Sequence, residues 1–188
     1  MRKNKTRAIV IKCFVLLVVL GTAYQAMAQD AKTTYPKLDQ YLMADRDAEI
    51  ALARSAAPES ISRAADVLIL GRHGFETAVK GKNGFVCIVG RSWTSAADAD
   101  FSDSKVRVPM CVNAAAARSY FLRITRITDL ILAGRTKAQM EETVLAAIEK
   151  KELPPMEAGA MCYMMGKEGY GGDSTPLASS PHVLLFGY

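Results

Sequence analysis

The sequence predicts an α+β fold, with a mostly antiparallel sheet made of a three-stranded meander plus two late strands and with three helices packed on it. Two observations lead to this class. The order of apolar patterns along the chain is helix, three strands, two helices and two strands. Strands that follow one another favour antiparallel pairing, and the pattern lacks the alternating β and α units of a doubly wound parallel sheet.

Residues 36–57 are expected to form the first helix, which Pro36 begins and Pro58 ends. Apolar side chains recur in it at helical spacing: Leu38, Tyr41, Leu42, Ala48, Leu52 and Ala56. Its charged side chains are expected on the other faces: Asp39, Arg46, Asp47, Glu49 and Arg54. The first helix is therefore expected to be amphipathic and to bury one face against the sheet.

Three strands are expected next, at residues 66–70, 75–80 and 85–89. The middle segment alternates apolar and polar residues, which is typical of a strand with one buried face, and the third (FVCIV) is apolar throughout, as a central strand is. The sequence Asn83-Gly84 lies between the last two strands and indicates a hairpin, because hairpin turns need positive φ angles. We therefore expect an antiparallel meander.

The second half of the domain is expected to begin with an extended segment at residues 106–112, since Pro109 lacks a backbone donor. Asn113 can cap the helix that follows, and Gly134 can end it. A capping-box sequence, Thr-Lys-Ala-Gln, begins the next helix at Thr136. Two late strands are expected at residues 160–165 and 182–186.

The first 28 residues have the pattern of a cleavable signal peptide. A basic segment precedes an apolar run at residues 13–20, and the small residues Ala26 and Ala28 stand before a cleavage point at Gln29. The apolar run is shorter than the roughly 20 residues that span a membrane, although a retained anchor is the alternative. We expect a periplasmic or secreted protein, without membrane attachment after cleavage, and a single globular domain at residues 29–188.

The charge of the chain depends on that cleavage. The first 28 residues hold five of the 24 Lys and Arg and none of the 19 Asp and Glu, so 19 basic and 19 acidic residues remain afterwards. A nucleic-acid-binding domain is typically basic, and a neutral one gives no support to that class. We therefore expect no nucleic-acid partner.

Three cysteines remain after the expected cleavage: Cys87, Cys111 and Cys162. An odd number in an oxidising compartment leaves one unpaired. Cys87 lies in the predicted central strand, and Cys111 lies in the extended segment that returns towards the sheet. We therefore predict a disulfide between these two, worth about 3 kcal/mol on the chain-entropy model. A reactive or metal-bound thiol is the alternative.

Four segments resemble a group of uncharacterised exported bacterial proteins. They are GKNGFVCIVGR at residues 81–91, PMCVNAAAARSY at 109–120, AGAMCYMMGKEGYGGD at 158–173 and PHVLLF at 181–186. The resemblance covers most of residues 60–186. It implies an exported single domain and implies no activity, cofactor or catalytic residue.

The candidate chemistry lies on the two late strands. Cys162 and His182 could form a nucleophilic pair of the kind that hydrolases use, and the alternative is a packed thiol beside an edge histidine. A copper-binding alternative rests on the methionine cluster beside Cys162: Met156, Met161, Met164 and Met165. Methionines also fill cores, and strand alternation would send these side chains to opposite faces.

The sequence leaves open whether the chain is an enzyme. The interpretation we favour is an exported binding or structural module for an unknown small molecule or protein, without a metal ion or cofactor.

Overall fold

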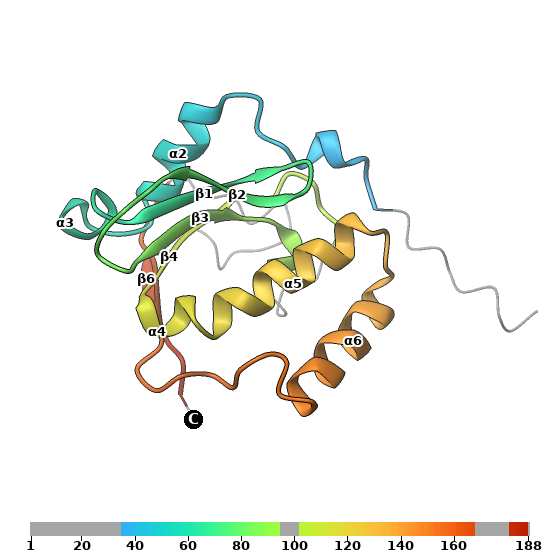
Figure 1. The fold of residues 1–188 in the computed structure, drawn as a ribbon. Helices are drawn as coiled ribbons and strands as arrows, with labels where there is room; N and C mark the ends of the chain where they lie inside the picture. The colour runs from blue at the N-terminus through green and yellow to red at the C-terminus, as the bar shows by residue number, and fades with distance from the viewer. Residues whose placement is uncertain (1–34, 95–101, 168–180, 188) are drawn as a thin grey trace, which may run out of the picture. The chain divides into compact units, whose positions relative to one another are not determined.

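A six-stranded mixed sheet is the centre of the structure (Figure 1). The computed structural model describes residues 35–94, 102–167 and 181–187, so the predicted signal peptide and its cleavage residues lie outside the described part. The strand order is β2-β1-β3-β4-β5-β6. The strands are β1 (Asp66–Gly71), β2 (Gly74–Val79), β3 (Val86–Gly90), β4 (Val108–Val112), β5 (Met161–Met164) and β6 (His182–Leu185).

Helices cover both faces of this sheet (Figure 1). Helix α2 contacts β1, β3 and β4 on one face, while α5 contacts β2 on the opposite face and α6 packs on α5. The helices are α2 (Arg46–Arg54), α3 (Glu59–Ser62), α4 (Ala114–Ala117), α5 (Tyr120–Leu132) and α6 (Lys137–Glu149), with 3-10 turns η1 (Leu38–Gln40) and η2 (Ser92–Thr94). The predicted α+β class is therefore confirmed, and α3 and α4 are additional to the three helices expected.

The first helix is shorter than residues 36–57. It begins only at Arg46, because the carboxylate of Asp45 accepts hydrogen bonds from the backbone N–H groups of Asp47 (2.9 Å) and Ala48 (3.0 Å). An aspartate in this position ends the preceding loop and starts a helix. The helix that was predicted to start at Thr136 does so, with both hydrogen bonds of its capping box present.

The predicted meander is wrong in one pairing. Strands β1 and β2 form an antiparallel hairpin, but β3 pairs with β1 and not with β2, and this pair is parallel. The remaining neighbours are antiparallel. The sheet is therefore mixed, and the segment around Asn83 is a crossing loop and not a hairpin turn.

The crossing loop is held against the residues that precede β1. The backbone N–H groups of Lys82 and Asn83 both donate to the carbonyl of Ala64, and the Asn83 side chain donates to the carbonyl of Ile61 (2.7 Å). A Cβ atom on Gly81 would lie 2.2 Å from the backbone of Ala65, so this close approach needs glycine. These contacts carry the chain across the start of β1 to its other side.

The predicted extended segment at 106–112 contributes β4, which lies between β3 and β5. Its register with β3 places Cys111 opposite Cys87 and Pro109 opposite Val89. Strand β5 pairs only with Cys111 and Val112, so the missing donor of Pro109 interrupts no observed pairing with β5.

Strand alternation divides the core between the two faces of the sheet. On the α2 side, small residues of α2 and of the segments after it pack on the strands; the buried set is Ala53, Ala56, Ala57, Ala65, Val67, Cys87, Val89 and Cys111. On the α5 side, larger residues fill the space: Ile88, Met110, Val112, Ala116, Phe121, Ile124, Ala160 and Cys162. The disulfide cysteines and Cys162 therefore belong to opposite faces.

Candidate functional site

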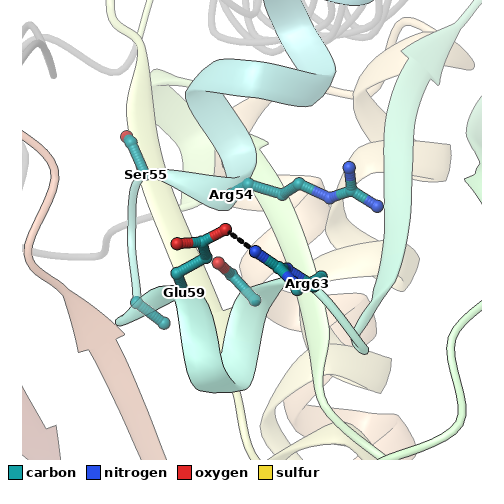
Figure 2. Close-up of a pocket in the computed structure, with 6 residues that line it drawn as sticks. Arg54, Ser55, Glu59 and Arg63 are labelled. Atoms are coloured by element: carbon teal, nitrogen blue, oxygen red, sulfur yellow. Dashed lines mark hydrogen bonds and ion pairs between the residues drawn. The ribbon is translucent and has the colours of Figure 1, made fainter.

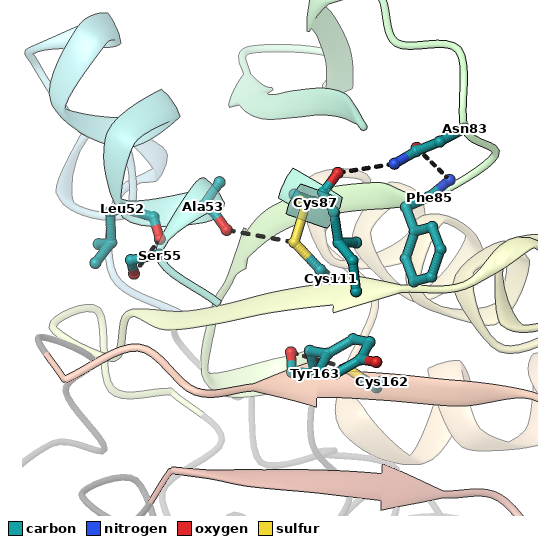
Figure 3. Close-up of a disulfide and its surroundings, with 10 residues drawn as sticks. Leu52, Ala53, Ser55, Asn83, Phe85, Cys87, Cys111, Cys162 and Tyr163 are labelled. Atoms are coloured by element: carbon teal, nitrogen blue, oxygen red, sulfur yellow. Dashed lines mark hydrogen bonds between the residues drawn. A yellow bond between two sulfur atoms is a disulfide. The ribbon is translucent and has the colours of Figure 1, made fainter. Parts of the chain in front are cut away.

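The predicted disulfide between Cys87 and Cys111 is present and directly bridges β3 and β4 (Figure 3). Both residues are fully buried, and their Cα atoms are 4.0 Å apart. The Cys111 sulfur lies 3.6 Å from the carbonyl oxygen of Ala53, which is a packing contact because a disulfide sulfur has no proton to donate. A buried disulfide indicates folding in an oxidising environment.

Cys162 and His182 lie on neighbouring strands but not opposite each other. The register pairs Cys162 with Leu184 and His182 with Met164. The Cys162 thiol is fully buried and donates to the carbonyl of Tyr163 (3.6 Å). Burial raises the pKa of this thiol to about 12, against a smaller opposing effect of a backbone hydrogen bond. A nucleophile must ionise, so the hydrolase interpretation stays a prediction that this environment weighs against.

The methionine cluster is divided between the two faces of the sheet. Met156 and Met164 pack against the core on the α5 side, where the Met156 sulfur accepts a hydrogen bond from Ser119 (3.6 Å). Met165 lines a hollow beside α2. The copper-binding interpretation stays a prediction, and these positions give its thioethers no common centre. Within the described ranges, no three His, Cys, Asp or Glu side chains group as metal ligands.

A buried ion pair that the sequence did not predict joins α2 to the end of β3. Glu49 was expected on a solvent-exposed face, but only 1 % of its surface is exposed, and Arg91 is fully buried. The Arg91 guanidinium donates to the Glu49 carboxylate (2.8 Å) and to the carbonyls of Tyr41 (2.8 Å) and Val89. The same carboxylate accepts the backbone N–H of Leu70 (3.3 Å).

The groups around this pair identify it as a structural anchor. Burial lowers the pKa of Arg91, and the nearby Glu49 carboxylate opposes that change. Burial, aided by the charge of Arg91, also lowers the pKa of Arg107 to about 10, which leaves this guanidinium charged at neutral pH. Arg107 donates to backbone carbonyls of its own loop and of Gln40. The guanidinium groups of Arg91 and Arg107 therefore donate to acceptors within the protein. Such bonds stabilise the fold and do not present a reactive group to a substrate.

One hollow, of about 400 Å³, lies between the end of α2 and α3 (Figure 2). It is lined partly by Arg54, Ser55, Glu59 and Arg63. Glu59 pairs with Arg63, whose hydrogen bond and charge lower the pKa of that carboxyl, while the Arg54 guanidinium extends away from Glu59 (Figure 2). The Ser55 hydroxyl donates to the carbonyl of Leu52 (2.7 Å). These groups do not converge on one point as catalytic groups would.

A second hollow, of about 650 Å³, lies along the outer side of α2. Four of its lining residues repeat at the spacing of a single helical stripe: Ala48, Ala51, Leu52 and Ser55. Met43, Met165 and Lys167 line it as well. The segment after β5 reaches α2 through Gly166, where a Cβ atom would lie 2.6 Å from Pro109 and 2.8 Å from Ser55. The hollow therefore has a mostly apolar lining with one lysine.

Exposed apolar side chains also lie at the end of β5 and on the last strand. Met165 is 39 % exposed, and on β6 the values are 40 % for Val183, 39 % for Leu184 and 77 % for Leu185. We call these four residues, together with the α2 hollow, the terminal apolar surface; Leu184 lies on the same sheet face as Cys162, and Val183 and Leu185 lie on the other face. Exposed apolar surface of this kind typically marks an interaction site.

No protein-family model, no curated protein and no solved structure matches the chain. The resemblance to exported bacterial proteins therefore stays a prediction. None of the described helices has the length and apolar character to cross a membrane.

Two parts of the site were missed from the sequence. The sequence assigned Ala48 and Leu52 to the buried face of the first helix, but Ala48 is exposed, Leu52 is half-buried and both line the hollow with Ala51 and Ser55, while Glu49 and Ala53 are buried instead. The exposure of β6 was not visible, because an apolar strand has the same pattern at a buried centre and at an open edge. Only the strand order distinguishes the two.

Proposed function

We propose that this chain is an exported binding module and that it binds its partner through the terminal apolar surface. The observation that carries the proposal is the position of the exposed apolar side chains. Four of the six large apolar residues that are exposed among the described ones belong to this surface, and the other two, Leu122 and Leu145, lie on α5 and α6. Large apolar side chains that are exposed on one strand and on the segment beside it typically mark an interaction site.

Export, to the periplasm or out of the cell, is supported by the sulfur chemistry. Cytosolic reductants keep most thiols reduced, whereas disulfides persist in exported proteins. The Cys87–Cys111 bridge is part of the packed core under α2, so it belongs to the folded architecture. The signal-like pattern of residues 1–28 points the same way.

The lining of the surface favours an apolar segment of a protein over a polar small molecule. The α2 hollow offers alanine, leucine and methionine side chains, with Ser55 and Lys167 as its polar groups. Apolar walls with few polar groups bind apolar groups chiefly by removing them from water.

A fluorescence titration tests the binding surface. The native protein is titrated with bis-ANS, a dye that fluoresces on apolar protein surfaces, and saturable binding is expected. Leu185→Lys should weaken that binding about tenfold, because one buried leucine contact is worth about 1.5 kcal/mol. The matched control is Leu145→Lys, which changes a leucine that is 61 % exposed on α6. Equal effects of the two substitutions would overturn the proposal.

Intact-mass spectrometry tests export. Protein recovered from the periplasm or medium of an expressing cell is expected to lack residues 1–28 and to weigh two hydrogens less than the reduced chain. A full-length chain in the cytosol with free thiols would contradict the proposed compartment.

A further inference from the structure

The outer side of β6 carries backbone groups that bond to no neighbouring strand among the described residues. The backbone N–H of Phe186 donates to Ala160, and the register of β5 and β6 continues from that bond. In an antiparallel pair, alternate residues direct their N–H and C=O groups to the same neighbour. The backbone N–H and C=O groups of Phe186, Leu184 and His182 are therefore directed towards β5. Those of Val183 and Leu185 are directed outward, away from β5.

Nothing in the sequence of β6 discourages pairing with another strand. Residues 181–187 contain no Lys, Arg, Asp or Glu. Proteins commonly protect an open edge with charged residues, a bulge or a proline within the strand. Here Pro181 precedes the strand, so Val183 and Leu185 keep their backbone donors.

We infer that β6 pairs with β6 of a second copy of this chain, as an antiparallel two-fold interface that joins two sheets into one. This inference rests on the proposed binding role of the terminal apolar surface and names its partner. The two-fold axis passes beside Leu184. Val183 of each copy then lies opposite Leu185 of the other, and all four outward N–H groups meet outward carbonyls.

The side chains favour the same symmetric register. The side chains of Val183 and Leu185 project from the sheet face opposite to Cys162. Across the axis, Val183 of one copy contacts Leu185 of the other copy on this face. Leu184 meets its own copy on the other face. Because the strand carries no Asp, Glu, Lys or Arg, the self-pairing sets no such charges of equal sign against each other. A charged partner would gain no complementary contact on β6, which favours a second copy over an acidic or basic peptide.

Sedimentation equilibrium and a designed crosslink test the interface. The exported form should sediment with twice the monomer mass over a wide concentration range. Val183→Pro removes an outward donor without removing a bond to β5, so it should yield a monomer. Leu184→Cys in a Cys162→Ala background should form an intermolecular disulfide, because directly opposed residues of this kind lie about 4.5 Å apart. The Cys162→Ala change prevents a bond with the intramolecular neighbour.

The controls separate this inference from the proposed function. Leu145→Cys in the same background should stay uncrosslinked under the same oxidation. A wild-type monomer with no crosslink at residue 184 would overturn the self-pairing. If that monomer still binds bis-ANS in a Leu185-dependent manner, the binding surface stands and its partner is another protein. If Leu185→Lys has no effect either, both proposals fail.

Discussion

The strands under α2 and the last two strands of the same sheet are held in different ways. Strands β3 and β4 are linked by a buried disulfide, and a buried ion pair joins α2 to the end of β3. Strand β6 is joined to the described structure chiefly by its pairing with β5 and by the contact of Phe186 with Tyr120, whose ring centroids are 4.5 Å apart. Among the described residues, the disulfide and the buried ion pair lie where α2 covers the sheet, and the exposed apolar side chains lie at the end of β5 and on β6.

The two edges of the sheet repeat this contrast. At the β2 edge, Glu76 is exposed, Lys80 pairs with Asp66 (2.9 Å), and Arg46 donates to the carbonyl of Ala78 (3.0 Å). At the β6 edge, residues 181–187 themselves contain no Lys, Arg, Asp or Glu. Charged residues prevent edges from adding strands, so the molecule protects one edge and leaves the other able to associate.

The largest decrease in the free energy of unfolding is expected when the buried ion pair is broken. Arg91→Met leaves the Glu49 carboxylate buried without its charged partner and should lower the free energy of unfolding by about 3–5 kcal/mol. Urea unfolding followed by the fluorescence of Trp93, the single tryptophan, measures it. Replacing both residues, in Glu49→Leu/Arg91→Met, should recover most of the loss because no unpaired charge remains.

The matched control is the exposed pair of Arg72 and Asp39, whose atoms are 2.7 Å apart. Arg72→Met should cost less than about 1 kcal/mol, since exposed pairs contribute little. If Arg91→Met cost no more than Arg72→Met, the covered part of the sheet would not depend on its buried ion pair, and the contrast would fail.

A second large decrease in the free energy of unfolding is expected when the disulfide is removed. Cys87→Ala/Cys111→Ala opens a link between residues 24 positions apart and should lower the unfolding free energy by about 3 kcal/mol. Cys162→Ala removes one buried sulfur without opening a link and should cost about 1 kcal/mol. Thermal unfolding of the three proteins compares them, and equal losses would mean that packing, not the link, matters at Cys87 and Cys111.

Local patterns predicted many elements, and non-local contacts decided the rest. The capping box at Thr136 and the disulfide were predictable because the first needs only neighbouring residues and the second only the placement of two segments in one sheet. The parallel pair of β1 and β3 was not, because Asn83 uses its side chain to bind Ile61, whereas a hairpin would use Asn83-Gly84 for a turn. That contact joins residues 22 positions apart.

The buried pair and the open edge were unpredictable for a related reason. Glu49 stands among charged residues of a helix, and only the position of Arg91 at the end of β3 makes its burial favourable. The candidate site likewise depends on which strand is last in the sheet, and strand order is a property of the whole fold.

A smaller change in the free energy of unfolding is expected when the pH rises, because of Cys162, the buried thiol on β5. Its pKa is raised from 9.0 to about 12, so above pH 9 the unfolded chain loses a proton that the folded chain keeps. Stability from this group is complete below pH 9 and should fall by about 1.4 kcal/mol per pH unit towards pH 12. Cys162→Ala should remove this part of the slope, as unfolding between pH 8 and roughly 10 would measure. Identical slopes would show that the thiol is not shielded, and that β5 opens more readily than the strands under α2.

The smallest effect on stability, and the sharpest test of the contrast between edges, is expected at β2. Glu76→Val/Lys80→Val gives this edge the apolar character of β6 and should change the unfolding free energy by less than about 1 kcal/mol, since both side chains are exposed. Because β2 and β6 are opposite edges of one sheet, pairing at both would add molecules in series, so dimers should grow into open-ended assemblies that scatter light. Glu149→Val/Lys150→Val, which makes the same chemical change at the end of α6, should not do so. Clear solutions of the β2 variant would mean that edge charge does not control association, and the bare edge of β6 would then need another explanation.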